Sequence, residues 1–487
     1  MRDIAKSVIK KLKEDGANFA DVRIHLQDET EDISTMNGTI DNYNYDSRQG
    51  YGIRVLFNGA WGFSSSEDMS KEAMFKTAKE AIEKAKTAST CIVDKIELAP
   101  KEIHQASYST PSEIDPFKVD TKEKITRLMD LDKKLGHDKF DYWGVSAYFN
   151  KREIFYIDTE GTETTRNLME VEGAYFAMAK DSEGHQQRRT YALWQDANGS
   201  QGWENFINDE QFDQTKRIQE ELLSIIEAKK CEQEVCDVIL LPEMMALQTH
   251  ETIGHALELD RILGYELSYA GGSHIDLEHF GSLQFGSSKL TARADGTVKN
   301  STGSIGFDDD GVKAENIVMI ENGLLKDAIT SRQMIVEANK KAGKTIFKKS
   351  GATCRAQSYS NLPIERMNNI NIDAGQDGTL EDIIANTKNG ILLETPRSWS
   401  IGSNRENFHF ACEIGWKIID GKISHVVKNP TYRGDSLKFW HSLDMVGNES
   451  TWQLQPTFNC GKGQPNQIMR LGHGIPVCRF SNVEVGN

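Results

Sequence analysis

Residues 51–66 read YGIRVLFNGAWGFSSS, and this segment indicates how the first half of the chain folds. Apolar and polar side chains alternate on both sides of Asn58-Gly59. An Asn-Gly pair between alternating segments is typical of a tight turn joining antiparallel strands. A second pair, Asn37-Gly38, predicts another such turn upstream. We therefore expect antiparallel hairpins in this part of the chain.

Helical patterns surround these hairpins. Residues 3–15 place four apolar side chains on one face, and Ser70 precedes a small-residue pattern as a typical N-cap for a helix over 70–86. The remaining elements predicted here are strands over 20–25, 142–149, 153–158 and 174–179, and a long helix over 209–228. Residues 1–230 are thus interpreted as an α+β domain of helices and antiparallel hairpins.

The second half has a different pattern. An apolar strand over 235–241 leads into a helix over 243–259. Beyond it the chain is rich in Gly, Asn and Asp, and short alternating strands are expected over 316–320, 324–329, 413–419 and 422–427. We place the boundary near residues 228–236 and predict that residues 231–487 form a mostly-β domain with one buried helix. The fold class as a whole is α+β.

Composition limits the classes of function. The chain has 487 residues with 57 Lys and Arg against 73 Asp and Glu, a net charge of −16. Such a surface repels phosphate, so direct nucleic-acid binding and attachment to an anionic membrane are not expected. No segment has the unbroken apolar length of a spanning helix, and the N-terminus resembles an amphipathic helix, not a signal peptide. Seven scattered cysteines suit a reducing cytoplasm.

The helix over 243–259 carries His250-Glu251-Thr252-Ile253-Gly254-His255. Two imidazoles are typical zinc ligands, and an adjacent Glu is a suitable general base. The histidines stand five positions apart, however, which on a regular α-helix separates them by about 140°. One inserted residue in a π-turn would bring both rings to one side, and Gly254 lowers the cost of that distortion. The alternative is a pair of partly buried histidines without a metal.

A catalytic zinc normally has three protein ligands and one open position. The side chains that offer a third ligand are Cys460, Cys354, Cys412, His274, His279, Glu258 and Asp260. Cys460 is attractive because it lies in a Gly-rich segment, where Lys462 would favour the thiolate. The alternative for any single cysteine, and the more common role, is a buried apolar residue.

Several segments together resemble one known family. They are GANFADVRI (16–24), GYGIRVLFNGAWGFSSS (50–66), HETIGHALELD (250–260), GSIGFDDDGV with IENGLLKDAI (303–329), RAQSYSNLPIERMNN (355–369) and MVGN with CGKGQ (445–464). Their order is similar to that of the TldD/PmbA family of metallopeptidases, also called modulators of DNA gyrase. The resemblance covers nearly the whole chain.

The resemblance implies a zinc site and its chemistry. His250, His255 and Cys460 match the family's zinc ligands, and Glu251 matches its general base. It implies a zinc-dependent peptidase. The β-rich C-terminal half in turn suggests that the substrate binds in extended form, as an added strand, which favours small or unfolded polypeptides. The resemblance also implies a dimer, with a second copy or with a related paralogue. The alternative function is a non-catalytic binding or regulatory subunit of a heterodimeric protease complex.

Weaker candidates lie outside this motif. Arg405 and His409, in a polar and aromatic segment, and the hydroxyl of Tyr432 are candidates for binding substrate or stabilising the oxyanion; an ordinary strand with a solvated face is the alternative. The run Asp308-Asp309-Asp310-Gly311 is interpreted as a turn whose carboxylates accept backbone N–H groups, with a cation site as its alternative.

Overall fold

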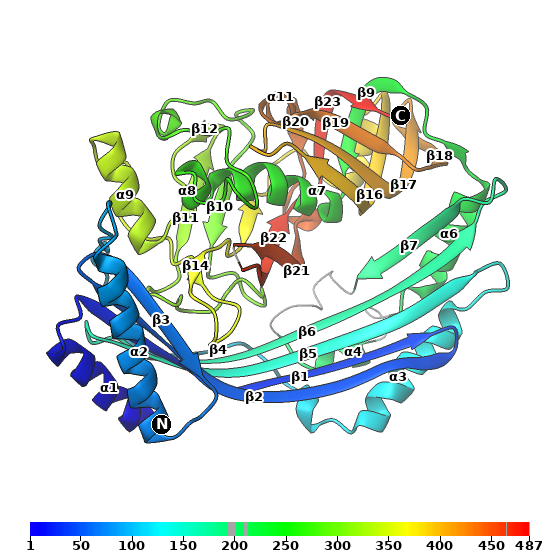
Figure 1. Ribbon diagram of the computed structural model, residues 1–487. Coiled ribbons are helices and arrows are strands. Elements are labelled where there is room, and N and C mark those ends of the chain that lie inside the picture. The colour runs from blue at the N-terminus through cyan, green and yellow to red at the C-terminus, as the bar shows by residue number, and fades with distance from the viewer. Residues whose placement is uncertain (193–200, 209–212, 464, 487) are drawn as a thin grey trace.

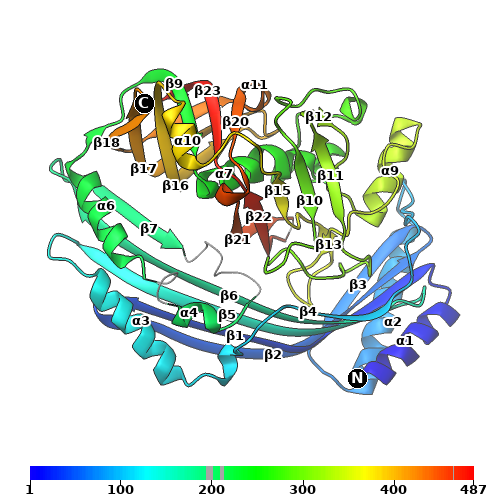
Figure 2. The same cartoon turned by 180° about the vertical axis from the view of Figure 1, so that it is seen from behind.

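A long, curved, mainly antiparallel sheet forms the base of the molecule, and the C-terminal half lies over its concave face (Figures 1 and 2). The computed structural model describes residues 1–192, 201–208, 213–463 and 465–486. Positions 209–212 of the predicted helix over 209–228 and Gln464 of the CGKGQ segment lie outside the described residues.

The base sheet has the strand order β3-β2-β1-β5-β6-β4, with β7 also paired to β6. Its strands are β1 (Phe19–Met36), β2 (Thr39–Phe57), β3 (Ala60–Ser66), β4 (Gln105–Ser109), β5 (Tyr142–Asp158), β6 (Glu163–Lys180) and β7 (Gln186–Ala192). Both predicted Asn-Gly turns are confirmed, because Asn37 and Asn58 have φ of 49° and 48° and join antiparallel neighbours. This left-handed conformation is the one a tight hairpin turn requires.

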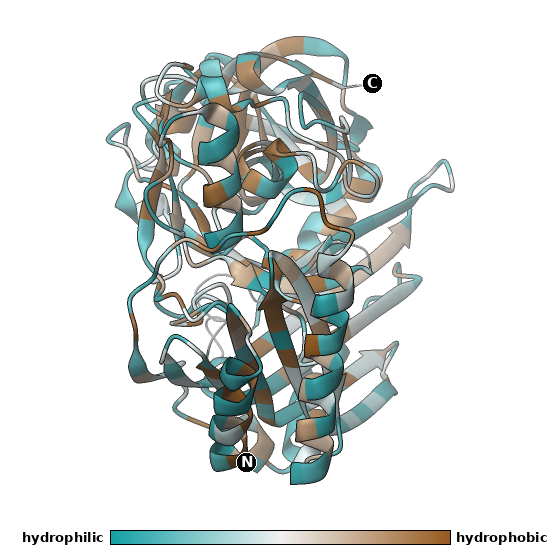
Figure 3. Ribbon diagram, turned by 60° about the vertical axis from the view of Figure 1, so that its left-hand side comes forward, coloured by the Kyte–Doolittle hydropathy of each residue, from teal (hydrophilic) through white to brown (hydrophobic). Residues whose placement is uncertain are grey.

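Helices cover both ends of the base sheet with separate apolar clusters. They are α1 (Arg2–Glu14), α2 (Lys71–Ser89), α3 (Thr121–Leu135), the short α4 (Glu204–Ile207) and α6 (Thr215–Glu227). The predicted cap of α2 is confirmed, since the Ser70 side chain accepts the backbone N–H of Ala73. The helices near the N-terminus carry hydrophilic and hydrophobic residues side by side (Figure 3), as expected of helices with one face on a sheet.

The C-terminal half is mostly β. Its main sheet has the order β16-β9-β23-β19-β17-β18-β8, with β20 paired to β23, and a smaller sheet has the order β12-β11-β10-β15. The strands are β8 (Lys229–Lys230), β9 (Glu234–Leu240), β10 (Ala292–Asp295), β11 (Asn316–Glu321), β12 (Leu324–Leu325), β13 (Cys354–Arg355), β14 (Ile364–Glu365), β15 (Ile370–Ile372), β16 (Asn389–Ile401), β17 (Asn407–Ile419), β18 (Lys422–Lys428), β19 (Thr431–Asp435), β20 (Leu443–Val446), β21 (Gln453–Lys462), β22 (Gln467–Ile475) and β23 (Cys478–Val485). The helices of this half are α7 (Pro242–Thr249), α8 (Leu259–Ile262), α9 (Arg332–Ala342), α10 (Leu380–Ala385) and α11 (Ser436–His441).

The α+β fold class is confirmed, and two element predictions need correction. The strands expected over 142–149 and 153–158 form one continuous strand, β5. The strand expected over 324–329 is limited to Leu324–Leu325. The division of the chain at residues 230 and 231 remains a prediction. Among the described residues, no helix combines the length and apolar character needed to cross a membrane.

Candidate metal centre

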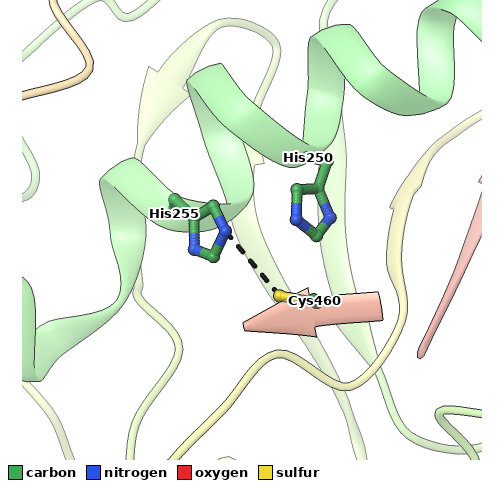
Figure 4. A group of neighbouring side chains, drawn as sticks. All are labelled: His250, His255 and Cys460. Carbon is green, nitrogen blue, oxygen red and sulfur yellow. Dashed lines mark hydrogen bonds between the residues drawn. The ribbon is translucent and has the colours of Figure 1, made fainter. Parts of the chain in front are cut away.

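The helix that follows β9 changes its winding at the two histidines. α7 ends at Thr249, residues His250–Gly254 form a π-helical turn, and His255–Leu257 form a 3₁₀ turn. The π-turn predicted from the five-residue spacing is therefore present. It brings the rings of His250 and His255 to one side of the helix, with centroids 4.6 Å apart (Figure 4).

Gly254 has a packing role at this turn. A β-carbon at this position would lie 2.4 Å from the Met367 sulfur, well inside contact distance. Because glycine has no side chain, the turn can pack closely against the segment that contains Met367.

Cys460 on β21 completes a group of three ligand atoms. One atom each of His250, His255 and Cys460 lie within 4.8 Å of one another, and the Cys460 Sγ is 3.7 Å from His255 Nε2 (Figure 4). All three residues are buried. The only other such group among the described residues is Asp276, Glu278 and His279, whose side chains are exposed or half-buried.

His473, which no sequence motif indicated, fixes the tautomer of His250. His473 Nδ1 lies 2.9 Å from the Ile370 carbonyl, which can only accept, so Nδ1 carries the proton. The unprotonated His473 Nε2 then accepts from His250 Nδ1 at 3.0 Å. Burial, followed by the charge of His250, lowers the pKa of His473 to about 3, which keeps it neutral. His250 is left with its Nε2 lone pair free for a metal.

Glu258 has the same effect on His255. Its carboxylate accepts from His255 Nδ1 at 2.8 Å, so the His255 lone pair is at Nε2, beside Cys460. Arg261 Nε donates to the same oxygen at 2.6 Å, and Lys462 Nζ lies 3.1 Å from the other. Burial alone would raise the pKa of Glu258, but Lys462, His255 and Arg261 hold it well below its ordinary value. Glu258, one of the sequence candidates for third ligand, thus orients a ligand instead.

The protonation states suit metal binding. Burial lowers the pKa of both His250 and His255, which favours the neutral, ligating imidazole. Burial alone would raise the pKa of the Cys460 thiol, but its neighbours His255 and Arg366 bring it below its ordinary value. Lys462, expected to favour the thiolate, instead forms ion pairs with Glu258 and Asp260.

The three residues open into a cleft of about 780 Å³ between the base sheet and the C-terminal half. Its walls come from β6 and β7 on one side and from α7, β16 and β21 on the other. His250, Glu251, His255 and Cys460 all line it, and Glu251 lies on the π-turn itself. The Glu251 side chain and the three candidate ligand residues thus line the same cleft.

The weaker candidates lie in different places. Arg405 lines the cleft from a turn at φ 66°; its Nη2 donates to the Ala270 carbonyl at 3.0 Å, and its buried Nε has no partner among the described residues. His409 lies on the exposed face of β17 and does not line the cleft. Tyr432 is fully buried and donates its hydroxyl to Gln248 Oε1 at 3.0 Å. The structure therefore brings only Arg405 of these three to the cleft.

The acidic run behaves as a turn. Asp308 Oδ1 accepts the backbone N–H groups of Asp310 and Val312, which is the interpretation favoured from the sequence. Asp309 and Asp310 additionally pair with arginines of the base sheet, among them Arg54, and so join the two halves of the molecule.

The donor set fits zinc. Two imidazoles and a thiolate are ligands that Zn²⁺ accepts at one site, and three protein ligands leave a position open. Both imidazoles already have an acceptor on the nitrogen that faces away from Cys460, as ligating histidines in metal sites do.

The chain is similar in sequence to known proteins. A sequence model described as the PmbA/TldA metallopeptidase C-terminal domain matches residues 233–487, and one described as PmbA/TldA metallopeptidase domain 1 matches residues 20–85. A metalloprotease of Methanocaldococcus jannaschii is 29% identical over 475 residues, 96% of each chain. A zinc metalloprotease TldD homolog of Saccharolobus solfataricus is 23% identical over 98% of each chain.

Solved structures share the fold. TldE from Thermococcus kodakarensis superposes with a TM-score of 0.73 at 14% identity, covering 99% of this chain and 100% of that one. A protein of Thermotoga maritima described as a putative modulator of DNA gyrase gives a TM-score of 0.72 at 16% identity, with complete coverage of both chains.

Proposed function

The chain belongs to the TldD/PmbA family of metallopeptidases, and from this premise we propose that it is a zinc-dependent peptidase acting on small or unfolded polypeptides. The observation that carries the proposal is the convergence of His250, His255 and Cys460 beside Glu251 in one cleft. We assign the three as zinc ligands and Glu251 as the general base. When bound there, Zn²⁺ would act as a Lewis acid and lower the pKa of a coordinated water.

The protein's own residues supply the proton transfers. The Glu251 carboxylate accepts a proton from the water whose oxygen attacks the scissile carbonyl carbon. It then donates that proton to the amide nitrogen as the C–N bond breaks, which regenerates the carboxylate and releases an amine. We propose Arg405, which lines the cleft, as a donor to the carbonyl oxygen as negative charge develops there.

The cleft suits an extended substrate. β7 and β21 both line it, and each hydrogen-bonds to only one neighbouring strand among the described residues. Part of the outer edge of β7 is already bonded to side chains, since Thr190 N–H donates to Glu413 and the Gln186 carbonyl accepts from Arg397. The part of β21 before Cys460 is therefore the edge proposed to pair with an added strand, a recognition mode that needs an unfolded segment. Folded proteins are therefore poor substrates in this proposal.

The proposed setting is a cytoplasmic dimer, either with a second copy or with a related paralogue. The structural likeness to TldE of Thermococcus kodakarensis supports a paralogous partner of the same fold. The net charge of −16 argues against direct nucleic-acid contact. Elution of a fully active monomer at working concentration would contradict the dimer.

The test is the substitution Glu251→Gln. The variant is expected to bind zinc as the wild type does and to lose peptide hydrolysis, because the carboxylate moves the proton and does not hold the metal. Glu449→Gln, at an exposed position, is the matched control and should keep full activity. Wild-type turnover by Glu251→Gln would refute the assignment of the base.

A further inference from the structure

A second cavity, of about 250 Å³, adjoins the metal cleft and is lined by four arginines. Arg152 and Arg166 come from β5 and β6 of the base sheet, and Arg355 and Arg470 come from β13 and β22 of the C-terminal half. The volume is roughly that of eight water molecules, enough for a side chain or a chain end. The overall charge of −16 makes this local concentration of arginine unusual.

Nearby carboxylates only partly balance these charges. Asp309 is shared between Arg166, at 2.5 Å, and Arg23, at 3.1 Å. Glu170 is shared between Arg152, at 2.8 Å, and Arg470, at 3.4 Å. Each carboxylate thus faces two guanidinium groups.

Arg355 makes no ion pair among the described residues. Its guanidinium donates only to two backbone carbonyls, those of Met367 at 2.9 Å and Arg470 at 2.8 Å, and the residue is 4% exposed. Burial, followed by the neighbouring Arg366, lowers its pKa to about 10. A buried guanidinium with no ion pair of its own is costly, which favours a ligand of opposite charge.

The other acidic groups nearby do not change this balance. Asp28 is hydrogen-bonded to His25, which lines the same cavity, at 2.9 Å. Burial raises the pKa of Glu172 to about 7, so that side chain is only partly charged at neutral pH. With Arg23 added to the four lining arginines and Asp28 added to Asp309 and Glu170, five guanidinium groups are set against three carboxylates. A purely structural bridge between the two halves would need no such surplus.

The cavity shares a wall with the metal cleft. Phe458 and Arg470 line both spaces, and Phe458 lies two residues before Cys460 on β21. The Arg470 guanidinium carbon is 5.7 Å from the Phe458 ring centroid and 4.4 Å from that of Tyr148. A substrate that occupies the cleft along β21 therefore runs next to the arginines.

We propose that this arginine-lined cavity binds a carboxylate of the peptide substrate and so gives the enzyme a preference for acidic substrates. The proposal rests on the proposed peptidase function. The recognised group is a carboxylate, which the planar guanidinium fork of arginine binds through two parallel hydrogen bonds. Its source is the C-terminal carboxylate or an acidic side chain of the peptide.

The first experiment measures peptide binding to zinc-loaded Glu251→Gln protein, so that no turnover interferes. Three hexapeptides of one sequence are compared: a free acid with an internal Glu, its C-terminal amide, and the free acid with Glu replaced by Gln. We expect about a 10- to 100-fold loss of affinity for whichever peptide lacks the recognised carboxylate, the size expected for a charge-assisted pair. The losing peptide identifies the source. Equal affinity for all three would overturn the proposal.

The second experiment uses Arg355→Gln in the otherwise native enzyme, with Arg293→Gln as control, because Arg293 pairs with Asp373 away from both cavities. We expect Arg355→Gln to raise KM for the carboxylate peptide about tenfold with little change in kcat, and to leave KM for the neutral analogue unchanged. An equal rise for both peptides would indicate a structural role and refute the proposal.

The two proposals fail in different ways. Peptide hydrolysis without any carboxylate preference would refute the carboxylate-binding proposal and support the peptidase proposal. If the protein binds the carboxylate peptide preferentially but hydrolyses no peptide, the peptidase proposal is refuted and the carboxylate-binding proposal is supported.

Discussion

Glu258→Gln tests how far the metal site depends on the group that orients His255. The substitution keeps the shape of the side chain and removes its charge. The 2.8 Å hydrogen bond from His255 Nδ1 loses its charge assistance, and the amide can present its NH₂ to the ring and reverse the tautomer. Loss of such an outer partner typically weakens metal binding about 10- to 100-fold, which is about 1.4–2.8 kcal/mol.

The same change has a second, separable effect. Arg261, at 2.6 Å, and Lys462, at 3.1 Å, lose the counter-charge they share in a fully buried position. Breaking a buried ion pair on one side costs about 3–5 kcal/mol of folding stability. The metal-free variant is therefore expected to unfold at a lower urea concentration than the metal-free wild type.

The assay is zinc affinity by competition with a chromophoric chelator, on protein shown to be folded by circular dichroism. Glu449→Gln is the exposed control and should match the wild type. His473→Gln provides a second perturbation, on the partner of His250, with the same expected range of loss. Wild-type zinc affinity in folded Glu258→Gln would show that this carboxylate does not orient a ligand.

Three further predictions follow from contacts in the structure. Burial alone would raise the pKa of Asp309, but its arginine partners hold that pKa below the unfolded value, so the stabilisation from Asp309 is present above about pH 5 and is lost as the pH falls through the folded pKa. The difference in unfolding free energy between wild type and Asp309→Asn should therefore shrink below about pH 4. A difference that stays constant with pH would contradict this prediction. Gly254→Ala should destabilise the chain by about 1–3 kcal/mol in urea unfolding, since the new methyl group meets Met367; an unchanged midpoint would argue against tight packing there. Tyr432→Phe should cost about 1–3 kcal/mol, because Gln248 Oε1 loses its buried donor, yet leave KM unchanged, and a raised KM would return Tyr432 to the substrate site.

Local sequence patterns predicted the features that depend on local geometry. The Asn-Gly turns, the Ser70 cap and the π-turn at His250–Gly254 each follow from the chain within a few residues. The π-turn is the clearest example, because the angular separation of the two histidines excluded a regular helix.

Long-range partners were beyond the reach of such patterns. His473 contacts His250 across 223 residues, and nothing near either histidine indicates the pairing. Lys462 stands two residues from Cys460, yet the fold directs it to Glu258 and Asp260, so proximity in sequence gave the wrong neighbour. Glu258 lies only three residues after His255, so its hydrogen bond to that ring could have been predicted from the local sequence.

The strand β5 shows why buried polar groups mislead a pattern-based assignment. Asn150, Lys151 and Arg152 interrupt the apolar alternation and suggested a break between two strands. In the structure Arg152 instead pairs with Glu170 on the adjacent β6 at 2.8 Å. Paired charges let the strand continue, and only the neighbouring strand reveals the pair.

The central claim is that His250, His255 and Cys460 hold one zinc ion, and zinc content per chain tests it most directly. The protein is purified without chelators, dialysed against Zn²⁺ and then against zinc-free buffer, and analysed by elemental mass spectrometry. We predict about one zinc per chain for the wild type and for Glu251→Gln, and far less for Cys460→Ser, which loses the thiolate ligand. Far less than one zinc in the wild type, or an undiminished zinc content in Cys460→Ser, would contradict the account.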